Sequence, residues 1–215
     1  MFTAVIFDMD GTLFDTEAVF QKYWNAIAKE RGIVLPDAFK YEICGTSGEV
    51  MNRIIEKQYR VKDGTEIQRE CKRRVAEELS RGVPLKPGCR EILASLHARG
   101  IPMAIGSSGR RAQIESNLSV SGFTSYFSAI ASGDEIFHGK PAPDIFLLAA
   151  KRLGVPPADC YVFEDSPNGI RAAHAAGMKP ILIPDLMPVT EEIASLTVGV
   201  YKVLTDALEE LVAGD

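Results

Sequence analysis

The sequence predicts an α/β protein with a Rossmann-like, doubly wound parallel sheet as its core and an inserted α-helical cap domain. Three features support this prediction: an apolar run near the start, a long stretch with only helical periodicity, and a later alternation of helical and strand-like segments. We expect residues 1–15 and 85–215 to form the core and residues 16–84 to form the cap.

The first predicted strand covers residues 3–7, Thr-Ala-Val-Ile-Phe. This run is continuously apolar instead of alternating, which is typical of a strand buried on both faces of a parallel sheet. The run stops at Asp8, so we expect the strand to end there.

The predicted cap begins with a helix from Thr16, because apolar residues then recur every three or four positions. Gly32 follows the last of them and can adopt the positive φ that often ends a helix. The pattern stays helical between Pro36 and Pro84. The residues that indicate these helices are Phe20, Tyr23, Trp24 and Ile27, then Met51, Ile54, Ile55 and Gln58, then Ile67, Cys71, Val75 and Leu79.

Beyond Pro87 and Gly88 the chain alternates between helix and strand, as in βαβ units. Ser166 precedes one predicted helix as an N-cap, and Gly177 follows it. The predicted strands are residues 101–106, 126–131, 160–163 and 180–183, and the predicted helices lie around residues 92–96, 114–118, 143–153 and 167–176. This order predicts parallel strands joined by crossover helices.

The composition is that of an ordinary globular protein with a mildly acidic surface. The 215 residues are 46% hydrophobic and 25% charged, and 24 Lys+Arg against 29 Asp+Glu give a net charge of −5. This charge favours neither nucleic acid nor a membrane as a partner. The four cysteines form no paired metal-binding motif, and no leader-like or membrane-length apolar segment is seen, so we expect a cytoplasmic protein. The oligomeric state stays open.

Few polar residues directly follow the predicted strands or lie beside them in conspicuous turns. Ligands of open α/β sheets bind at the carboxyl ends of the strands, so these residues are expected to converge. They are Asp8 and Asp10 after the first strand, Ser107 after the second, Lys140 in the segment Gly139-Lys140-Pro141, and Glu164 and Asp165 after the strand of residues 160–163.

The four carboxylates of this group would repel one another at a single point unless a cation balanced them. Hard divalent cations prefer carboxylate and carbonyl oxygens, and Mg²⁺ commonly also contacts substrate phosphate oxygens. We therefore expect Mg²⁺ as the cofactor, with Lys140 and Ser107 completing an anion-binding site.

The same segments carry a resemblance to a known family. Asp8-Met9-Asp10-Gly11-Thr12, the Ser107 turn, Gly139-Lys140-Pro141 and Glu164-Asp165 resemble, in order, the four motifs of the haloacid dehalogenase superfamily. The helical insertion and Phe163-Glu164-Asp165-Ser166-Pro167-Asn168-Gly169 resemble its β-phosphoglucomutase-like subgroup. The resemblance spans nearly the whole chain and implies a phosphate-ester hydrolase.

The resemblance also implies a role for each site residue. Asp8 would be the nucleophile that forms an aspartyl phosphate, and Asp10 would act as the general acid and base. The implied metal ligands are Asp8, Asp10 through its backbone carbonyl, Glu164 and Asp165, and the implied phosphate-binding groups are Lys140, the Ser107 hydroxyl and the backbone N–H groups of Met9 and Ser108.

The favoured function is hydrolysis of a small phosphorylated metabolite, such as a sugar or nucleoside phosphate. A phosphomutase is the nearest alternative, but known β-phosphoglucomutases carry a histidine where this chain has Phe20 and an arginine where it has Gly48. A dehalogenase would need neither Asp10 as a leaving-group acid nor a metal. A non-catalytic phosphometabolite-binding or regulatory protein is the alternative of another class, and the complete acid and lysine set disfavours it.

Overall fold

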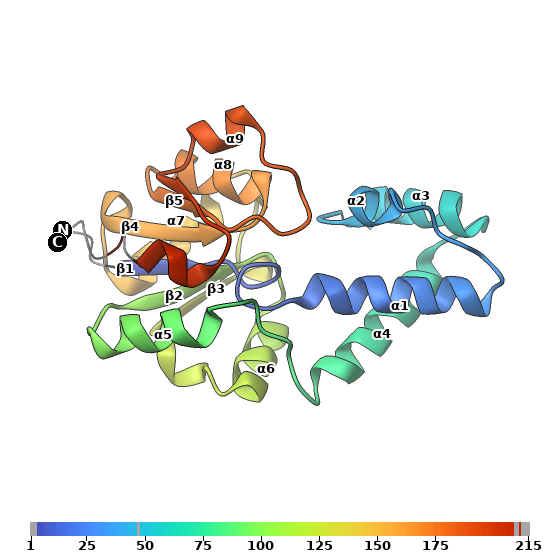
Figure 1. The fold of residues 1–215 in the computed structure, drawn as a ribbon, viewed down its shortest axis with the longest axis horizontal. Coiled ribbons are helices and arrows are strands. Elements are labelled where there is room, and N and C mark those ends of the chain that lie inside the picture. The colour runs from blue at the N-terminus through green and yellow to red at the C-terminus, as the bar shows by residue number, and fades with distance from the viewer. Residues whose placement is uncertain (1–3, 47, 209–210, 212–215) are drawn as a thin grey trace. The chain divides into compact units, whose positions relative to one another are not determined.

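A computed structural model describes residues 4–46, 48–208 and 211. The chain forms two compact units, Met1–Asp15 with Pro84–Asp215, called here the sheet unit, and Thr16–Val83, called the helical unit (Figure 1). The chain leaves the sheet unit after Asp15 and returns to it at Pro84. The helical unit is therefore one uninterrupted insertion into the chain of the sheet unit.

The described part of the sheet unit contains a six-stranded parallel sheet in the order β3-β2-β1-β4-β5-β6. This is the doubly wound order of a Rossmann-like fold, as predicted. β1 (Ala4–Phe7) lies between β2 (Met103–Ser107) and β4 (Cys160–Glu164). After β1 the next two strands of the chain are added on one side of β1. The chain then crosses back and places β4 on the other side, so the strand order reverses between β1 and β4.

The other strands are β3 (Ala129–Ser132), β5 (Lys179–Leu182) and β6 (Gly199–Val200). The helices of the sheet unit are α5 (Cys89–Ala98), α6 (Arg111–Ser121), α7 (Asp144–Leu153), α8 (Pro167–Ala175) and α9 (Glu191–Ser195). The described residues of this unit also form the 3₁₀ turns η1 (Thr124–Tyr126), η2 (Gly133–Glu135), η3 (Pro157–Asp159) and η4 (Leu204–Ala207). Most of the strands and longer helices occur where the periodicity predicts them. Thr3, the first residue of the first predicted strand, lies outside the described residues.

Two predicted strands start later than expected. Residues 101–102 precede β2, and Pro102 has no N–H to donate, although its carbonyl accepts a hydrogen bond from the Val5 N–H at 3.0 Å. Tyr126 belongs to η1 instead of β3, and its ring packs edge-on against Phe123. A short apolar segment fits a partly exposed turn as well as a strand, so periodicity alone does not separate them.

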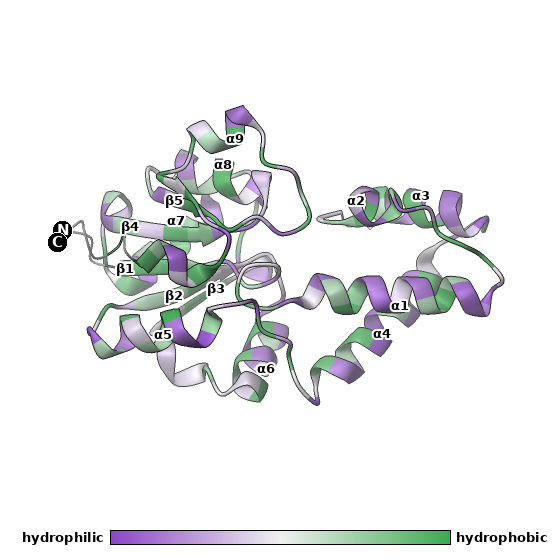
Figure 2. Cartoon of the chain, viewed as in Figure 1, coloured by the Kyte–Doolittle hydropathy of each residue, from purple (hydrophilic) through white to green (hydrophobic). Residues whose placement is uncertain are grey.

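Helices α7 and α8 cover one face of the sheet. Ala4 and Ile6 of β1 belong to the same apolar cluster as these helices. Because side chains alternate along a strand, Phe7 points to the opposite face, where its ring stacks on Phe163 with centroids 4.9 Å apart. Figure 2 shows the corresponding mixture of hydrophobic and hydrophilic residues along the helices. Both faces of β1 and β4 are buried, which explains their continuously apolar sequences.

The helical unit consists of α1 (Thr16–Glu30), α2 (Phe39–Ile43), α3 (Gly48–Tyr59) and α4 (Thr65–Leu79). Its own core contains an aromatic group of Trp24, Phe39 and Tyr59, whose rings meet edge to face. The Tyr59 hydroxyl donates a hydrogen bond to the backbone carbonyl of Trp24 at 2.6 Å, so this buried polar atom is satisfied. The predicted α4 face of Ile67, Cys71, Val75 and Leu79 is buried in the same core.

Candidate active site

The reversal of strand order brings together residues that are far apart in the sequence. Asp8 follows β1, and Glu164 and Asp165 lie at the end of β4, the strand that pairs with β1 in register. The Asp8 N–H donates a hydrogen bond to the carbonyl of Phe163 at 2.9 Å, which continues the pairing beyond β1. Ligands of doubly wound sheets bind at this kind of position, so the acids meet where a ligand is expected.

Lys140 links two of these acids through short ion pairs. Its Nζ lies 2.5 Å from Asp8 Oδ1 and 2.6 Å from Glu164 Oε1, and all three side chains are nearly buried. The Nζ atom also lies 4.8 Å from the centre of the Phe146 ring of α7. Because the ring face attracts a cation, Phe146 supports the position of the ammonium group between the two carboxylates.

Asp8, Glu164 and Asp165 form a possible metal-binding group. Each offers a carboxylate oxygen, and these oxygens all lie within 4.8 Å of one another. Asp165 is also held by the Thr12 hydroxyl, which donates a hydrogen bond to Oδ1 at 3.2 Å. Clustered oxygen ligands of this kind fit a hard cation such as Mg²⁺.

Asp8 and Asp165 of this group have raised pKa values. Burial raises the pKa of Asp8 to about 7, and the neighbouring Lys140 lowers it only in part. The pKa of Asp165 is also raised, first by burial and then by the charges of Glu164 and Asp8. Burial lowers the pKa of Lys140, but the two bonded carboxylates outweigh this and raise it above its ordinary value. Full ionisation of the three carboxylates would place more negative charge here than Lys140 balances, and a divalent cation would compensate for the excess.

Gly11 allows the loop after β1 to approach Asp165. Its φ is +87°, and a Cβ atom there would lie 2.5 Å from Asp165 Oδ2. The carbonyl of Met9 accepts hydrogen bonds from the N–H groups of Leu13 and Phe14, both at 3.0 Å, so the loop turns tightly. A residue with a side chain at position 11 would be strained and would push Asp165 away.

Asp10 and Ser107 lie near the same loop of the sheet unit. A Cβ atom added at Gly109 would lie 3.3 Å from Ser107 Oγ and 4.0 Å from Asp10 Oδ2, so both side chains lie close to this glycine. The Ser107 side chain is buried, and its oxygen accepts a hydrogen bond from the Gly109 N–H at 3.1 Å. Its hydroxyl hydrogen remains a possible donor to an anion.

The two remaining predicted site residues, Met9 and Ser108, are placed differently. The Met9 side chain is fully buried in the apolar core, so only its backbone could contact a ligand. Ser108 is exposed on the loop after β2, and its carbonyl lies against Gly133. The structure therefore shows Asp8, Lys140, Glu164 and Asp165 in one connected group, with Asp10, on the loop after β1, close to Ser107 at the end of β2.

Several residues that hold the acids were not predicted as part of the site. Ser166 was expected only as the N-cap of α8, and its oxygen does accept a hydrogen bond from the Gly169 N–H. The same residue donates two hydrogen bonds to Glu164 Oε2, from its N–H at 2.8 Å and its hydroxyl at 2.9 Å. Gly169 packs directly against Glu164, with no room for a Cβ atom. Their place directly after Glu164-Asp165 is the signal that could have indicated this support.

No helix among the described residues is both long and apolar enough to cross a membrane.

Known proteins resemble this chain over most of its length. A probable pseudouridine-5'-phosphatase of Drosophila melanogaster is 37% identical over 191 residues, covering 85% of this chain and 82% of that protein. A fructose-1-phosphate phosphatase of Escherichia coli is 36% identical and covers 84% of this chain and 95% of that protein.

A solved structure extends the similarity to the fold. A haloacid dehalogenase family hydrolase from Deinococcus radiodurans, solved with bound phosphate and sodium, superposes with a TM-score of 0.83 at 28% identity. The match covers 99% of this chain and 96% of that one. Residues 5–183 also match the model of one protein family. The chain belongs to that family, the haloacid dehalogenase-like hydrolases.

Proposed function

We propose that this protein is a Mg²⁺-dependent phosphatase that hydrolyses a small phosphorylated metabolite through an aspartyl-phosphate intermediate. One observation carries the proposal: the buried Asp8 carboxylate lies at the reversal of strand order, where it is bonded to the Lys140 ammonium and grouped with the carboxylates of Glu164 and Asp165. The names of the relatives support a phosphatase, since two of them are a pseudouridine-5'-phosphatase and a fructose-1-phosphate phosphatase.

In the proposed reaction, a carboxylate oxygen of Asp8 attacks the phosphorus atom of the substrate. The bond between phosphorus and the ester oxygen breaks, and Asp10 gives a proton to the departing alkoxide. A water molecule then attacks the phosphorus of the aspartyl phosphate while Asp10 takes a proton from it. This second step releases inorganic phosphate and restores Asp8, so both atoms and protons balance over the cycle.

The site has the ligands that Mg²⁺ would need. Asp8, Glu164, Asp165 and the backbone carbonyl of Asp10 would hold the ion, and the clustered oxygens with raised carboxylate pKa values fit a cation. When bound, Mg²⁺ would reduce the repulsion between an anionic nucleophile and an anionic phosphate.

The remaining residues of the site would bind the phosphoryl group. Lys140 is close enough to Asp8 to offset negative charge on both the nucleophile and the phosphoryl oxygens. Ser107 would donate its hydroxyl, and Met9 and Ser108 would donate their backbone N–H groups. The buried Met9 side chain and the exposed Ser108 side chain both fit a contribution through the backbone.

We further propose that the helical unit acts as a cap domain. Its single insertion between Asp15 and Pro84 and its separate core support this role. The Asp15 N–H donates a hydrogen bond to the Pro84 carbonyl at 2.9 Å, so the departing and returning segments lie side by side at the base of the insertion. Paired segments of this kind could serve as a hinge.

Release of inorganic phosphate tests the proposal. The purified protein is incubated with p-nitrophenyl phosphate and with a panel of sugar and nucleoside phosphates, with Mg²⁺ or with excess EDTA. We expect release from p-nitrophenyl phosphate and from at least one metabolite, loss of release in EDTA, and recovery when Mg²⁺ is restored. Release that EDTA does not affect would contradict the metal role, and no release from any ester would favour a binding protein.

The products separate a phosphatase from a phosphomutase. With a sugar phosphate as substrate, a phosphatase releases phosphate and free sugar, whereas a mutase forms an isomeric sugar phosphate without net release. We expect net release, because Phe20 and Gly48 replace the cap histidine and arginine of known β-phosphoglucomutases. Isomer formation as the main outcome would overturn this assignment.

A further inference from the structure

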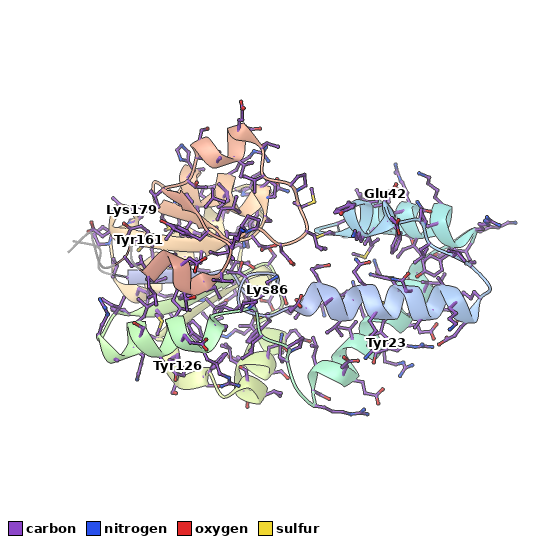
Figure 3. The ribbon with its side chains drawn as sticks, viewed as in Figure 1. Tyr23, Glu42, Lys86, Tyr126, Tyr161 and Lys179 are labelled. Carbon is purple, nitrogen blue, oxygen red and sulfur yellow. The ribbon has the colours of Figure 1, made fainter. Side chains whose placement is uncertain are left out.

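A second ion pair of the sheet unit has no role in the proposed chemistry. Lys86 Nζ lies 2.7 Å from Asp185 Oδ1, and the two side chains are only 14% and 12% exposed. Lys86, labelled in Figure 3, lies on the segment that returns from the helical unit, and Asp185 follows β5. Few charged pairs are this well shielded from water, so the pair is unlike an ordinary surface contact.

Lys86 is attached to the loop that supports one proposed metal ligand. Its N–H donates a hydrogen bond to the carbonyl of Leu13 at 2.9 Å. The preceding residue, Thr12, donates its hydroxyl hydrogen bond to Asp165. Lys86 is therefore hydrogen-bonded to the residue that follows Thr12, and Thr12 supports Asp165.

Asp185 approaches the same acids from β5. The Ile183 N–H donates a hydrogen bond to the carbonyl of Glu164 at 2.8 Å, two residues before Asp185. Asp185 therefore lies just beyond the residue that is bonded to Glu164, without belonging to the group of possible ligands.

One oxygen of Asp185 lacks a partner. Lys86 binds Oδ1, whereas Oδ2 is buried and has no hydrogen bond within the part of the chain that the structure describes. Leaving a buried polar atom unsatisfied costs about 1–3 kcal/mol, so such an atom usually has a water or a ligand as its partner. Mg²⁺ keeps several water molecules when it binds to proteins, and these waters are strong hydrogen-bond donors.

We propose that Asp185 is a positioning residue of the metal site, whose Oδ2 accepts a hydrogen bond from a water molecule of the hydrated Mg²⁺ while Lys86 holds Oδ1. This inference rests on the proposed Mg²⁺-dependent function. The additional carboxylate attracts the cation, and the lysine prevents the carboxylate from rotating away. Residues that support metal ligands or waters in this way typically change metal affinity when they are replaced.

Calorimetric titration with Mg²⁺ alone tests the proposal, with the melting temperature of the metal-free protein as a second readout. Asp185→Asn keeps the shape and an acceptor for Lys86, and we expect it to weaken Mg²⁺ binding about tenfold. Lys86→Met keeps the carboxylate, so it should lower the melting temperature but weaken Mg²⁺ binding clearly less than Asp185→Asn. Glu192→Gln removes an equal charge from an exposed ion pair with Arg171 and serves as the matched control, with unchanged binding.

The titrations separate a failure of the Asp185 role from a failure of the proposed Mg²⁺ dependence. Equal Mg²⁺ affinity in Asp185→Asn and the wild type would overturn the role of Asp185, and so would equal weakening in Asp185→Asn and Lys86→Met, because the ion pair would then act only as a structural support. If the wild type itself bound no Mg²⁺, the proposed metal dependence would fail, and this inference would fail with it.

Discussion

Arg74 of the helical unit and Lys140 of the sheet unit each bind two carboxylates, but the bound acids differ in their chemistry. Arg74 contacts Glu30 at 2.7 Å and Glu70 at 2.5 Å, and its hydrogen bond holds the pKa of Glu30 below the usual value. Lys140 contacts Asp8 at an equally short distance, yet the pKa of Asp8 rises to about 7.

Burial explains this difference. Half of the Glu30 side chain is exposed, so water stabilises its charge, whereas the Asp8 side chain is only 9% exposed. Removal from water penalises the charged form more than one lysine compensates, particularly with Glu164 beside it. The ion pairs of Arg74 lie at the surface of the helical unit. The buried acids of the site lower the stability of the fold, and their proposed role is chemical instead.

Replacing Lys140 of the sheet unit should have a much larger effect than replacing Arg74 of the helical unit. Lys140→Met leaves Asp8 and Glu164 buried without their partner, so we expect a loss of about 3 kcal/mol in the free energy of unfolding. Phosphate release should fall at least about a hundredfold, because the positive charge that would offset the phosphoryl oxygens is lost. Chemical denaturation and phosphate assays measure both quantities. Unchanged activity in a folded variant would remove Lys140 from the mechanism.

Two glycines with positive φ provide a second contrast. Gly11→Ala places a Cβ atom 2.5 Å from Asp165 Oδ2, whereas Gly32→Ala in the helical unit meets no atom within 4 Å. Both variants suffer backbone strain of about 1 kcal/mol, but only Gly11→Ala should also displace Asp165. We expect weaker Mg²⁺ binding and slower phosphate release in Gly11→Ala alone. Equal rates in the two variants would show that the close approach of Gly11 is unimportant.

The pH dependence of stability should differ in sign between the regions. Between pH 4 and pH 7, folded Asp8 keeps its proton while the unfolded chain releases it, so Asp8 makes the metal-free protein less stable as pH rises. Glu30 has a lowered pKa, so its contribution is lost as pH falls below its unfolded value. Melting curves without metal should show a smaller decline from pH 5 to pH 7 in Asp8→Asn than in the wild type. An identical decline would contradict the raised pKa of Asp8.

The smallest effect is expected from the cation of the helical unit. Arg74→Met breaks ion pairs that are partly exposed, and such pairs contribute about 1 kcal/mol or less. We expect a small decrease in melting temperature and unchanged phosphate release from p-nitrophenyl phosphate. A stability loss as large as that of Lys140→Met would show that burial does not separate the two regions.

Much of the fold follows from local patterns in the sequence. The apolar runs of β1 and β4 indicate strands that are buried on both faces, and the stripe of α4 indicates a helix packed on one face. Neither β6, with two residues, nor α9, with five, is long enough to produce a recognisable period. Their positions depend on contacts with the rest of the sheet unit instead.

The candidate site divides in a similar way. Asp8, Glu164 and Asp165 could be predicted as neighbours because each lies at or directly after the end of a parallel strand, and parallel strands end at one edge of the sheet. The Lys86–Asp185 pair could not, because its members are 99 positions apart in the sequence and belong to no recognised motif. Supporting contacts of this kind depend on how loops fold against each other, which strand periodicity does not reveal.

Phosphate release by Asp8→Asn shows directly whether Asp8 is the nucleophile. The variant keeps the size of the side chain but loses the nucleophilic carboxylate, and a control melting curve establishes that it is folded. With saturating Mg²⁺ and p-nitrophenyl phosphate, we expect the wild-type protein to release phosphate and Asp8→Asn to release none above background. Wild-type rates in the folded variant would contradict covalent catalysis by Asp8.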